Sequence, residues 1–294
     1  MRAASTEQTK ETEKRGQDSG ARPKALVRAV QLGIAVLYPW PRAKTLKNGV
    51  RLMIDPKKNW IDFNLAVKSQ YEEGTLGLID RLLPEQGVFI DVGANIGVMS
   101  VFAARKAGKA GLALAFEPDN KNFARLTWAR EANSVPQLLP FPLALGHASA
   151  MAPLRRAPSG DGGLSSLAEL EGFVEHSSVA IVSMDDVLSV LPVSRVDVIK
   201  IDVEGAEKAV IDGAQETLRR FKPAVIMEMV TDAGVAAGEQ LVGWGYVALH
   251  AGAKEKPLAG KLARYAPQKL SHNNMLFVHA TKIDALSSSG LEIA

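Results

Sequence analysis

The sequence has 294 residues, with 35 Lys and Arg against 32 Asp and Glu, and it contains no cysteine. A chain without cysteine forms no disulfide bond, thiolate zinc site or iron–sulfur cluster, and it has no thiol nucleophile. The formal net charge of +3 also disfavours nucleic-acid binding, which normally needs a concentrated basic face. The length accommodates one large α/β domain with appendages, or two small domains.

The first 40 residues fall into two segments of opposite character. Residues 1–24 are highly charged with few apolar side chains, so we expect a disordered tail. Residues 25–40 are strongly apolar but contain Arg28, Gln31 and Gly33, and they fall short of the ~20 apolar residues that a bilayer span requires. We predict a helix packed on the domain or on a second subunit. The alternative is an in-plane helix that makes a peripheral membrane contact.

With no transmembrane span and no secretory signal expected, we predict a cytoplasmic location. Short strand-like runs follow at 51–54 and 65–67, near the turn-prone segment Lys47-Asn48-Gly49. The predicted organisation is a tail at 1–24, a helix and hairpin extension at 25–70, a main domain at 71–280 and a loose C-terminal tail at 281–294.

After Tyr71, apolar runs typical of strands alternate with stretches typical of helices. This alternation predicts an α/β fold whose mostly parallel sheet carries helices on both faces. A ligand is then expected beyond the carboxyl ends of the strands, near the point where strand order reverses. The predicted strands are 88–92, 112–116, 138–141, 196–201, 224–229, 246–249 and 274–278, and the predicted helices include 98–106, 121–132, 206–220 and 235–242.

The first strongly apolar strand leads directly into Gly93-Ala-Asn-Ile-Gly97 and then into a helix, an order typical of nucleotide-type cofactor sites. A dinucleotide fingerprint requires small residues where this chain has Asn95 and Val98, whose side chains would crowd a pyrophosphate. A cofactor without phosphates fits better, and S-adenosylmethionine is such a molecule. The backbone amides of the loop, that of Ala94 included, would face the carboxylate of its amino-acid tail.

Two acidic residues are candidates for contacts with this cofactor. Asp91, near the strand end, could accept from the ammonium of its amino-acid tail, directly or through water. Glu117 lies 24 residues after Gly93, near the ~20 at which an acidic residue receives the ribose hydroxyls. The alternative for Glu117 is a solvent-facing strand end, or a cap for a helix that begins near Asp119.

Four segments, in this order and spacing, resemble the successive motifs of the FkbM-type S-adenosylmethionine-dependent methyltransferases. The resemblance extends from about Tyr71 to Val278, and the first 40 residues have no counterpart in it. The four segments are Phe89-Ile-Asp-Val-Gly-Ala-Asn-Ile-Gly97, Phe116-Glu-Pro-Asp-Asn120, Val198-Ile-Lys-Ile-Asp-Val-Glu-Gly-Ala-Glu207 and Pro223-Ala-Val-Ile-Met-Glu228.

The resemblance implies a Rossmann-like class I methyltransferase fold with a mostly parallel seven-stranded sheet, whose last strand is antiparallel and would be 274–278. It also implies methyl transfer to a hydroxyl of a small molecule, a sugar or glycan, or a lipid-like metabolite. Carried over residue by residue, Asp91, Gly93, Asn95 and Gly97 line the methionine part of the cofactor and Glu117 holds the ribose. Glu72 would close over the cofactor, and Ser165-Ser166 resembles a Ser-rich stretch before the fourth strand.

The strand 196–201 ends in Asp202-Val-Glu-Gly205. Alternation along a strand puts Lys200, Asp202 and Glu204 on one side, at the carboxyl end beside the cofactor loop. Asp202 is the candidate for the carboxylate that faces the methyl acceptor, either as a base or as an orienting hydrogen-bond acceptor. Glu204 is the second candidate for that catalytic role.

A structural interpretation of the same residues stays open. Lys200, if buried, is expected to pair with a carboxylate such as Asp202, Glu204 or Glu228. Glu204 and Glu207 could equally be helix N-terminal charges that the macrodipole favours. Carboxylates at one strand end also suit Mg²⁺, but nothing in the spacing requires it and the histidines form no metal-binding pattern. We therefore predict no metal.

The alternative functions are a nucleic-acid methyltransferase, a non-catalytic binding module and an NAD-dependent dehydrogenase. Base-amine methylation of nucleic acid is expected to show an Asn/Asp-Pro-Pro-aromatic sequence after the fourth strand, where this chain has Asp202-Val-Glu-Gly205. Cytosine-C5 chemistry needs a cysteine. A non-catalytic module that binds the cofactor or a partner is a further alternative, because binding loops survive the loss of catalysis. An NAD-dependent dehydrogenase is disfavoured by Asn95 and Val98.

Overall fold

The computed structural model describes residues 33, 40–57, 60–156, 165–167, 172, 174–266 and 271–293. The chain divides into two units, Met1–Trp40 and Pro41–Ala294, and the second unit carries the fold. The tail predicted at 1–24 lies outside the described residues, as does the helix predicted at 25–40 except for Gly33 and Trp40. No helix in these described ranges combines the length and the apolar character needed to cross a bilayer.

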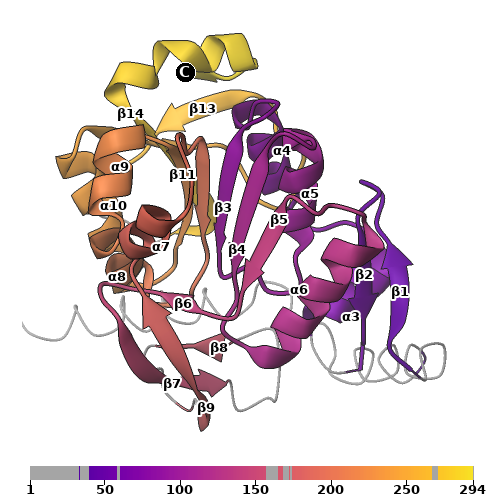
Figure 1. Ribbon diagram of the computed structural model, residues 1–294. Coiled ribbons are helices and arrows are strands. Elements are labelled where there is room, and N and C mark those ends of the chain that lie inside the picture. Colours follow the sequence, from indigo (N-terminus) through magenta and orange to yellow (C-terminus); the bar gives the residue numbers. More distant parts are fainter. Residues whose placement is uncertain are drawn as a thin grey trace, which may run out of the picture. The chain divides into compact units, whose positions relative to one another are not determined.

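In the described part of the chain, nine strands form the main sheet, in the order β15-β13-β12-β14-β11-β10-β3-β4-β5 (Figure 1). The central strands β3 and β10 are buried along their whole length, which explains why they read as nearly continuous apolar runs. The bounds are β3 Val88–Val92, β4 Leu112–Phe116, β5 Leu138–Phe141, β10 Val198–Ile201, β11 Ala224–Met229, β12 Tyr246–His250, β13 Lys261–Arg264, β14 Ser271–His279 and β15 Glu292–Ile293.

The strands β5, β4, β3, β10 and β11 pair in parallel. Strand β14 enters antiparallel between β11 and β12, so the predicted Rossmann-like sheet with an antiparallel last strand is confirmed. Two further strands, β13 and β15, extend this sheet beyond β12. Strand order reverses between β3 and β10, and a crevice is expected at the carboxyl ends of these two strands.

Helices cover both faces of the sheet, with α4, α5 and α6 on one face and α7 to α10 on the other (Figure 1). This arrangement follows from the strand–helix–strand alternation, because each helix must bury its apolar stripe against the sheet. The bounds are α3 Trp60–Lys68, α4 Glu73–Leu82, α5 Val98–Ala107, α6 Asn120–Ala132, α7 Met184–Val190, α8 Glu207–Asp212, α9 Gln215–Phe221 and α10 Asp232–Gly243.

Two predicted elements are wrong. The strand-like run 65–67 lies within helix α3, because a three-residue apolar run does not distinguish a strand from a buried helix turn. The single helix predicted over 206–220 is two helices, α8 and α9. The break falls at Gly213, which lies so close to Gly146 that a Cβ on it would be 1.9 Å from the Gly146 carbonyl oxygen.

The hairpin expected around Lys47-Asn48-Gly49 is present, with β1 (Arg42–Thr45) antiparallel to β2 (Arg51–Ile54). It is attached to helix α6 through Arg125, whose guanidinium donates to the Met53 carbonyl at 2.7 Å and pairs with the buried Asp62. Removing one partner of such a mostly buried pair is costly, because it leaves an uncompensated charge in the interior. The hairpin is therefore anchored to the helix that follows β4.

A second sheet, which the sequence analysis did not predict, lies between β5 and α7. Its described strands are β6 (Ala144–Leu145), β7 (Ala150–Arg156), β8 (Ser165–Ser166) and β9 (Val174–Val182), in the order β6-β9-β7-β8. Most of its described side chains are at least partly exposed, so the sequence lacks the alternation that marks a half-buried strand. Arg156 of β7 pairs with Asp119 at the start of α6, which attaches this sheet to the domain.

The C-terminal residues are ordered, contrary to the expected loose tail at 281–294. They form the 3₁₀ helices η1 (Ala280–Lys282) and η2 (Asp284–Ser289), and β15 then pairs with β13. Leu286 and Leu291 are buried, and Arg81 of α4 donates to the Gly290 carbonyl. Two buried leucines in a polar segment give no periodic pattern, which is why the sequence did not reveal this packing.

Candidate active site

A pocket lies at the carboxyl ends of β3, β4 and β10, where strand order reverses. Part of its lining is apolar, including Val92, Met99, Phe116 and Leu145. Another part is charged, with more carboxylates than ammonium groups, so the pocket suits a ligand that carries positive charge. The charged residues that line it are Glu72, Glu117, Lys200, Asp202, Glu204, Glu228 and Lys254.

The glycine loop after β3 forms one wall of the pocket. Gly93 has a φ of 82°, and the N–H groups of Gly93 and Ala94 both donate to the Phe116 carbonyl at 3.0 Å. A Cβ on Gly93 would lie 1.9 Å from the carbonyl oxygen of Asp202. Glycine is required here because the loop crosses directly over the end of β10, and this brings the cofactor loop next to the acidic segment.

Glu117 ends β4 with its carboxylate held in one orientation. Its two oxygens accept hydrogen bonds at 2.8 Å from the backbone N–H groups of Asn95 and Asp119. The helix-cap role falls to Asp119, whose side chain accepts from the N–H groups of Lys121 and Asn122. Burial raises the pKa of Glu117 to about 7, although these two hydrogen bonds oppose the rise. A fixed carboxylate at this position can accept from the two hydroxyls of a ribose.

Asp91 is fully buried beneath the loop and is not part of the pocket lining. Its Oδ2 accepts from the Ser100 hydroxyl, whereas Oδ1 has no hydrogen-bond partner within the described residues. Burial raises the pKa of Asp91, and the attraction of Lys200 opposes that rise. Asp91 therefore acts on the pocket through its neighbours in the sheet, and a direct contact with a ligand is not part of this geometry.

Lys200, which is buried, and Asp202, which is half-buried, form an ion pair at the end of β10. The Lys200 Nζ lies 3.0 Å from the Asp202 Oδ2, and only 4% of Lys200 is exposed. Burial lowers the pKa of Lys200, but the charges of Asp202, Asp91 and Glu72 outweigh it and raise the pKa above its ordinary value. Burial likewise raises the pKa of Asp202, but the attraction of Lys200 and Lys254 holds it below its ordinary value. Both groups are charged at neutral pH.

Glu204 follows with its backbone in the left-handed region, at a φ of 50°. The Ser166 hydroxyl donates to the Glu204 carbonyl at 2.6 Å, so the second sheet holds this turn in place. Burial raises the pKa of Glu204 to about 7, with further contributions from the charges of Asp202 and Glu228. A non-glycine residue in this conformation costs energy, and such strain clusters at functional sites.

The helix N-terminal interpretation applies to Glu207 and not to Glu204. Glu207 begins α8, and its carboxylate accepts from the Gly205 N–H and from the Thr231 hydroxyl, each at 3.0 Å. These contacts close the start of the helix and connect it to α10. Glu207 is thus a structural residue beside the pocket, whereas Glu204 lines it.

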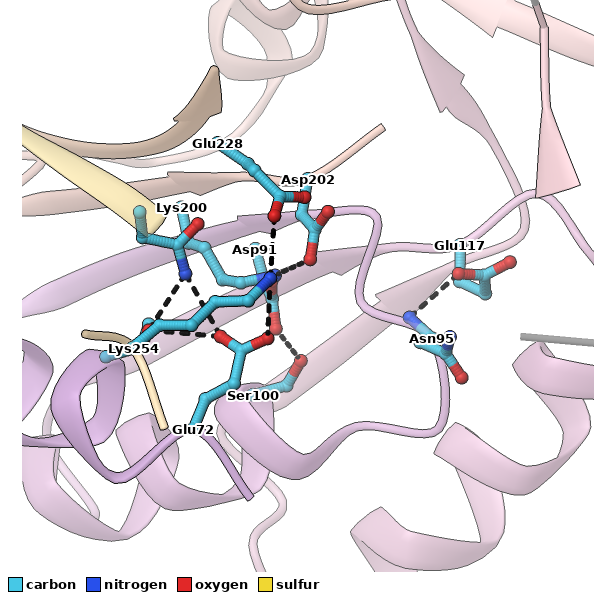
Figure 2. Close-up of polar contacts among 11 residues, drawn as sticks. Glu72, Asp91, Asn95, Ser100, Glu117, Lys200, Asp202, Glu228 and Lys254 are labelled. Carbon is cyan, nitrogen blue, oxygen red and sulfur yellow. Dashed lines mark hydrogen bonds and ion pairs between the residues drawn. The ribbon is translucent and has the colours of Figure 1, made fainter. Parts of the chain in front are cut away.

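Sequence reasoning missed Lys254, whose side chain connects two acidic residues. Its Nζ lies 2.6 Å from Glu228 Oε1 and 3.6 Å from Glu72 Oε1. Glu72 in turn accepts from the Thr75 hydroxyl and the Asn274 amide, both at 3.0 Å. Figure 2 shows Glu72, Lys200, Asp202, Glu228 and Lys254 gathered in one cluster, with Glu117 and Asn95 apart from it. Lys254 lies in a loop without a motif, so no local signal marked it.

The structure brings most of the predicted site residues to one pocket. Those that line it are Glu72, Gly93, Ala94, Asn95, Glu117, Lys200, Asp202 and Glu204. Asp91, Gly97 and Ser166 are not among the lining residues. Gly97 begins α5 against Leu126, where a Cβ would lie 2.6 Å from the leucine Cδ1, and Ser166 supports the Glu204 turn. These three support the residues that line the pocket.

The arrangement fits S-adenosylmethionine. Glu117 presents a buried, oriented carboxylate to a ribose diol, and the surplus of carboxylates suits a cationic sulfonium and ammonium. When bound, this cofactor supplies a methyl group attached to positively charged sulfur. Glu117 is the group that would hold its ribose, with the loop residues Gly93 to Asn95 lining the pocket beside it. The backbone N–H groups of these three loop residues already donate to Phe116 and Glu117, so the expectation that they face the cofactor carboxylate is wrong.

Several solved structures are similar to parts of this chain. A methyltransferase FkbM from Methylobacillus flagellatus KT is 14% identical with a TM-score of 0.44, covering 66% of this chain but only 44% of that longer chain. SMU.1697c from Streptococcus mutans, solved in complex with SAH, is 10% identical with a TM-score of 0.39, covering 71% of this chain and 96% of that one. Cofactor-bound Rv0187 from MTB is 13% identical with a TM-score of 0.42, covering 89% and 92%.

No curated protein matches the sequence. The assignment of this chain to a family rests instead on a match to a protein-family model. Residues 91–241, just over half of the chain, match the family described as the methyltransferase FkbM domain. That segment begins within β3 and contains the glycine loop, Glu117 and the Lys200–Asp202 pair. The protein therefore belongs to the FkbM methyltransferase family, and its methyl donor is S-adenosylmethionine.

Proposed function

We propose that this methyltransferase acts on oxygen, at a hydroxyl of an uncharged small molecule, a sugar or glycan, or a lipid-like metabolite. The observation that supports it is the acidic end of the pocket, where Asp202, Glu204 and Glu228 each have an oxygen within 4.8 Å of one another. Carboxylates accept hydrogen bonds from hydroxyl groups and repel phosphates and other carboxylates. Both lysines of the pocket are already engaged by carboxylates, so neither is available to an anionic acceptor.

We assign different roles to the two carboxylates that follow β10. Asp202 is held ionised by Lys200, so it is a poor proton acceptor and a good orienting group for the acceptor hydroxyl. Glu204, whose pKa burial raises to about 7, is the base that would accept the proton of the acceptor hydroxyl. Groups whose environments push their pKa values apart divide the work of catalysis in this way, and a base works best with a pKa near the operating pH.

The test begins by finding the acceptor. The full chain is incubated with methyl-labelled S-adenosylmethionine and separate panels of glycans, lipids, metabolites and nucleic acids. A labelled methyl group on an oxygen of a glycan, lipid or metabolite supports the proposal. Label in nucleic acid or on nitrogen contradicts it. Binding of the cofactor without transfer to any panel would favour a non-catalytic module.

With that acceptor, we expect Glu204→Gln to lower kcat by about 10²- to 10⁴-fold, the usual contribution of a general base, with cofactor affinity unchanged. Wild-type kcat should rise with pH up to about 7 and then level off, because Glu204 must be ionised to accept a proton. Asp202→Asn should also lower kcat with cofactor affinity preserved, and the pH profile should shift to lower pH because the charge of Asp202 contributes to the raised pKa of Glu204. Full activity in Glu204→Gln would remove it from the mechanism.

A further inference from the structure

Lys254 lies in the loop between β12 and β13, far in sequence from the residues that it contacts. Its ammonium group lies 2.6 Å from Glu228 Oε1, at the end of β11, and 3.6 Å from Glu72 Oε1. Its positive charge also stabilises the ionised forms of Asp202 and Glu204. A single ammonium group thus acts on four carboxylates of the pocket. Figure 2 shows three of them, Glu72, Asp202 and Glu228, around Lys254.

The backbone of this loop is held against helix α4, which fixes where Lys254 begins. The Gly74 N–H donates to the Lys254 carbonyl at 2.8 Å. A Cβ on Gly74 would lie 2.9 Å from the carbonyl oxygens of both Ala253 and Lys256. Only a glycine allows so close an approach of helix and loop. The contact with helix α4 therefore fixes the backbone position of Lys254.

The three carboxylates near this ammonium have a spacing that would suit a metal ion. Asp202, Glu204 and Glu228 each offer an oxygen within 4.8 Å of the other two. Oxygens on opposite sides of a Mg²⁺ ion lie about 4.2 Å apart. Carboxylates this close together repel one another unless a cation lies among them. In this chain two ammonium groups, those of Lys200 and Lys254, supply the two positive charges that a divalent ion would bring.

We propose that Lys254 is a positioning residue that takes the place of a divalent cation in the acceptor site. It holds Glu228, neutralises the cluster formed with Asp202 and Glu204, and so allows the acceptor pocket to work without a metal ion. This inference rests on the proposed hydroxyl methylation. It also restricts the class of acceptor. The acceptor binds by donating hydrogen bonds to carboxylates, and it does not need two oxygens that chelate a metal.

The proposal is tested first by Mn²⁺ binding to the full chain, because Mn²⁺ prefers oxygen ligands and free Mn²⁺ is measured directly by its paramagnetic resonance signal. We expect Lys254→Met to bind one Mn²⁺ at least tenfold more tightly than the wild type does. Thermal unfolding provides a second measurement, since Mn²⁺ should raise the Tm of Lys254→Met and leave the wild-type Tm unchanged. Neither measurement needs the acceptor or the cofactor.

Two matched variants control the experiment. Lys208→Met removes the same charge from the partly exposed pair with Asp212 on α8, and it should bind no more Mn²⁺ than the wild type. The double variant Lys254→Met/Glu228→Gln should lose the new binding. Where Lys254→Met does not fold, Lys254→Gln replaces it, because glutamine removes the charge and keeps a hydrogen-bond donor. A folded variant that binds no Mn²⁺, or a wild type that binds it equally well, overturns the proposal.

The catalytic part of the Lys254 proposal is tested with the acceptor found by the labelling experiment. Wild-type turnover should be unaffected by a chelator, and Lys254→Met should lose at least tenfold in kcat/KM and recover part of it when Mg²⁺ or Mn²⁺ is added. A merely structural lysine would give a loss that metal does not reverse, and a wild type inactivated by the chelator contradicts the proposal. If no hydroxyl acceptor exists, the proposed function fails, and the Mn²⁺ measurements still decide whether Lys254 replaces a cation.

Discussion

Replacing Lys200 by methionine should lower the free energy of unfolding by about 3–5 kcal/mol, the usual cost of removing one partner from a buried charge pair. Lys200 is 4% exposed and lies 3.0 Å from Asp202. It also stabilises the ionised forms of Glu72 and Asp91, which are both buried. Methionine fills a similar volume, so the loss reports the missing charge and not a cavity. Urea unfolding followed by circular dichroism measures it.

The loss of unfolding free energy in Lys200→Met should depend on pH. The direction of this dependence follows from the carboxylates that the substitution leaves without a lysine partner. Without the lysine, the pKa values of Glu72, Asp91 and Asp202 rise in the folded state and stay ordinary in the unfolded state. Ionised carboxylates then destabilise the fold at high pH, and protonation relieves them. The deficit should therefore be smaller at about pH 5.5 than at about pH 8.

The matched control for Lys200→Met is Lys208→Met, which breaks a partly exposed pair and should change stability by no more than about 0.5 kcal/mol. The double variant Lys200→Met/Asp202→Asn should recover part of the loss, because contacting partners are not additive. If Lys200→Met is as stable as the wild type, the buried carboxylates of the cluster are neutral, and the charge assignment given above is wrong.

Replacing Glu117 should have the largest effect on cofactor binding. A hydrogen bond to a charged group contributes about 1.5–3 kcal/mol. Losing two of them in Glu117→Ala should therefore weaken S-adenosylmethionine binding by about 100-fold or more, at tenfold per 1.4 kcal/mol. Calorimetry with the cofactor and its demethylated product measures the affinity. NADH should not bind, and a chain that binds NADH in place of these two ligands would contradict the cofactor assignment.

Glu117→Gln is the matched variant, because it keeps the shape of the side chain and one acceptor oxygen. The alanine variant also leaves the Asn95 and Asp119 N–H groups without their acceptor, so thermal unfolding must accompany both variants. An affinity equal to that of the wild type in a folded Glu117→Gln chain would exclude contact with the ribose through a charged carboxylate.

The same carboxylate predicts how cofactor affinity varies with pH. Since burial raises the pKa of Glu117 to about 7, the carboxylate is ionised above that pH and affinity should be constant there. Below about pH 7 the affinity should fall up to tenfold per pH unit. Glu117→Gln should abolish this slope. Glu204 titrates in the same range, so Glu204→Gln, which should retain the slope, separates the two groups.

Much of the fold could be predicted from the sequence because the strands of a parallel sheet are buried on both faces. The runs at 88–92, 112–116 and 224–229 coincide with β3, β4 and β11. The second sheet escaped prediction because its strands are largely exposed, and exposed strands carry no apolar periodicity. The helix break at Gly213 escaped it too, and this glycine lies against Gly146, which is far along the chain.

The candidate site, like the fold, could be predicted from the sequence only in part. The glycine loop, Glu117 and the Asp202-Val-Glu-Gly205 segment were found because each follows directly from the end of a strand, and local order along the chain implies the position of such groups. The pairing of Lys200 with Asp202, among three carboxylates that the sequence left open, was decided by the structure. The structure also decided the burial of Asp91 beneath the loop and the position of Lys254 beside Glu228.

The sequence alone predicts an α/β chain with a methyl-donor site beyond its first strands. Its candidate catalytic groups are carboxylates, and thiol chemistry is excluded because no cysteine is present. Only the tertiary structure decided which carboxylates are ionised and paired, and that burial raises the pKa of both Glu117 and Glu204 to about 7. The physical reason is that a pKa depends on burial and on charges within a few ångströms. Those neighbours come from loops and strands that are distant in sequence.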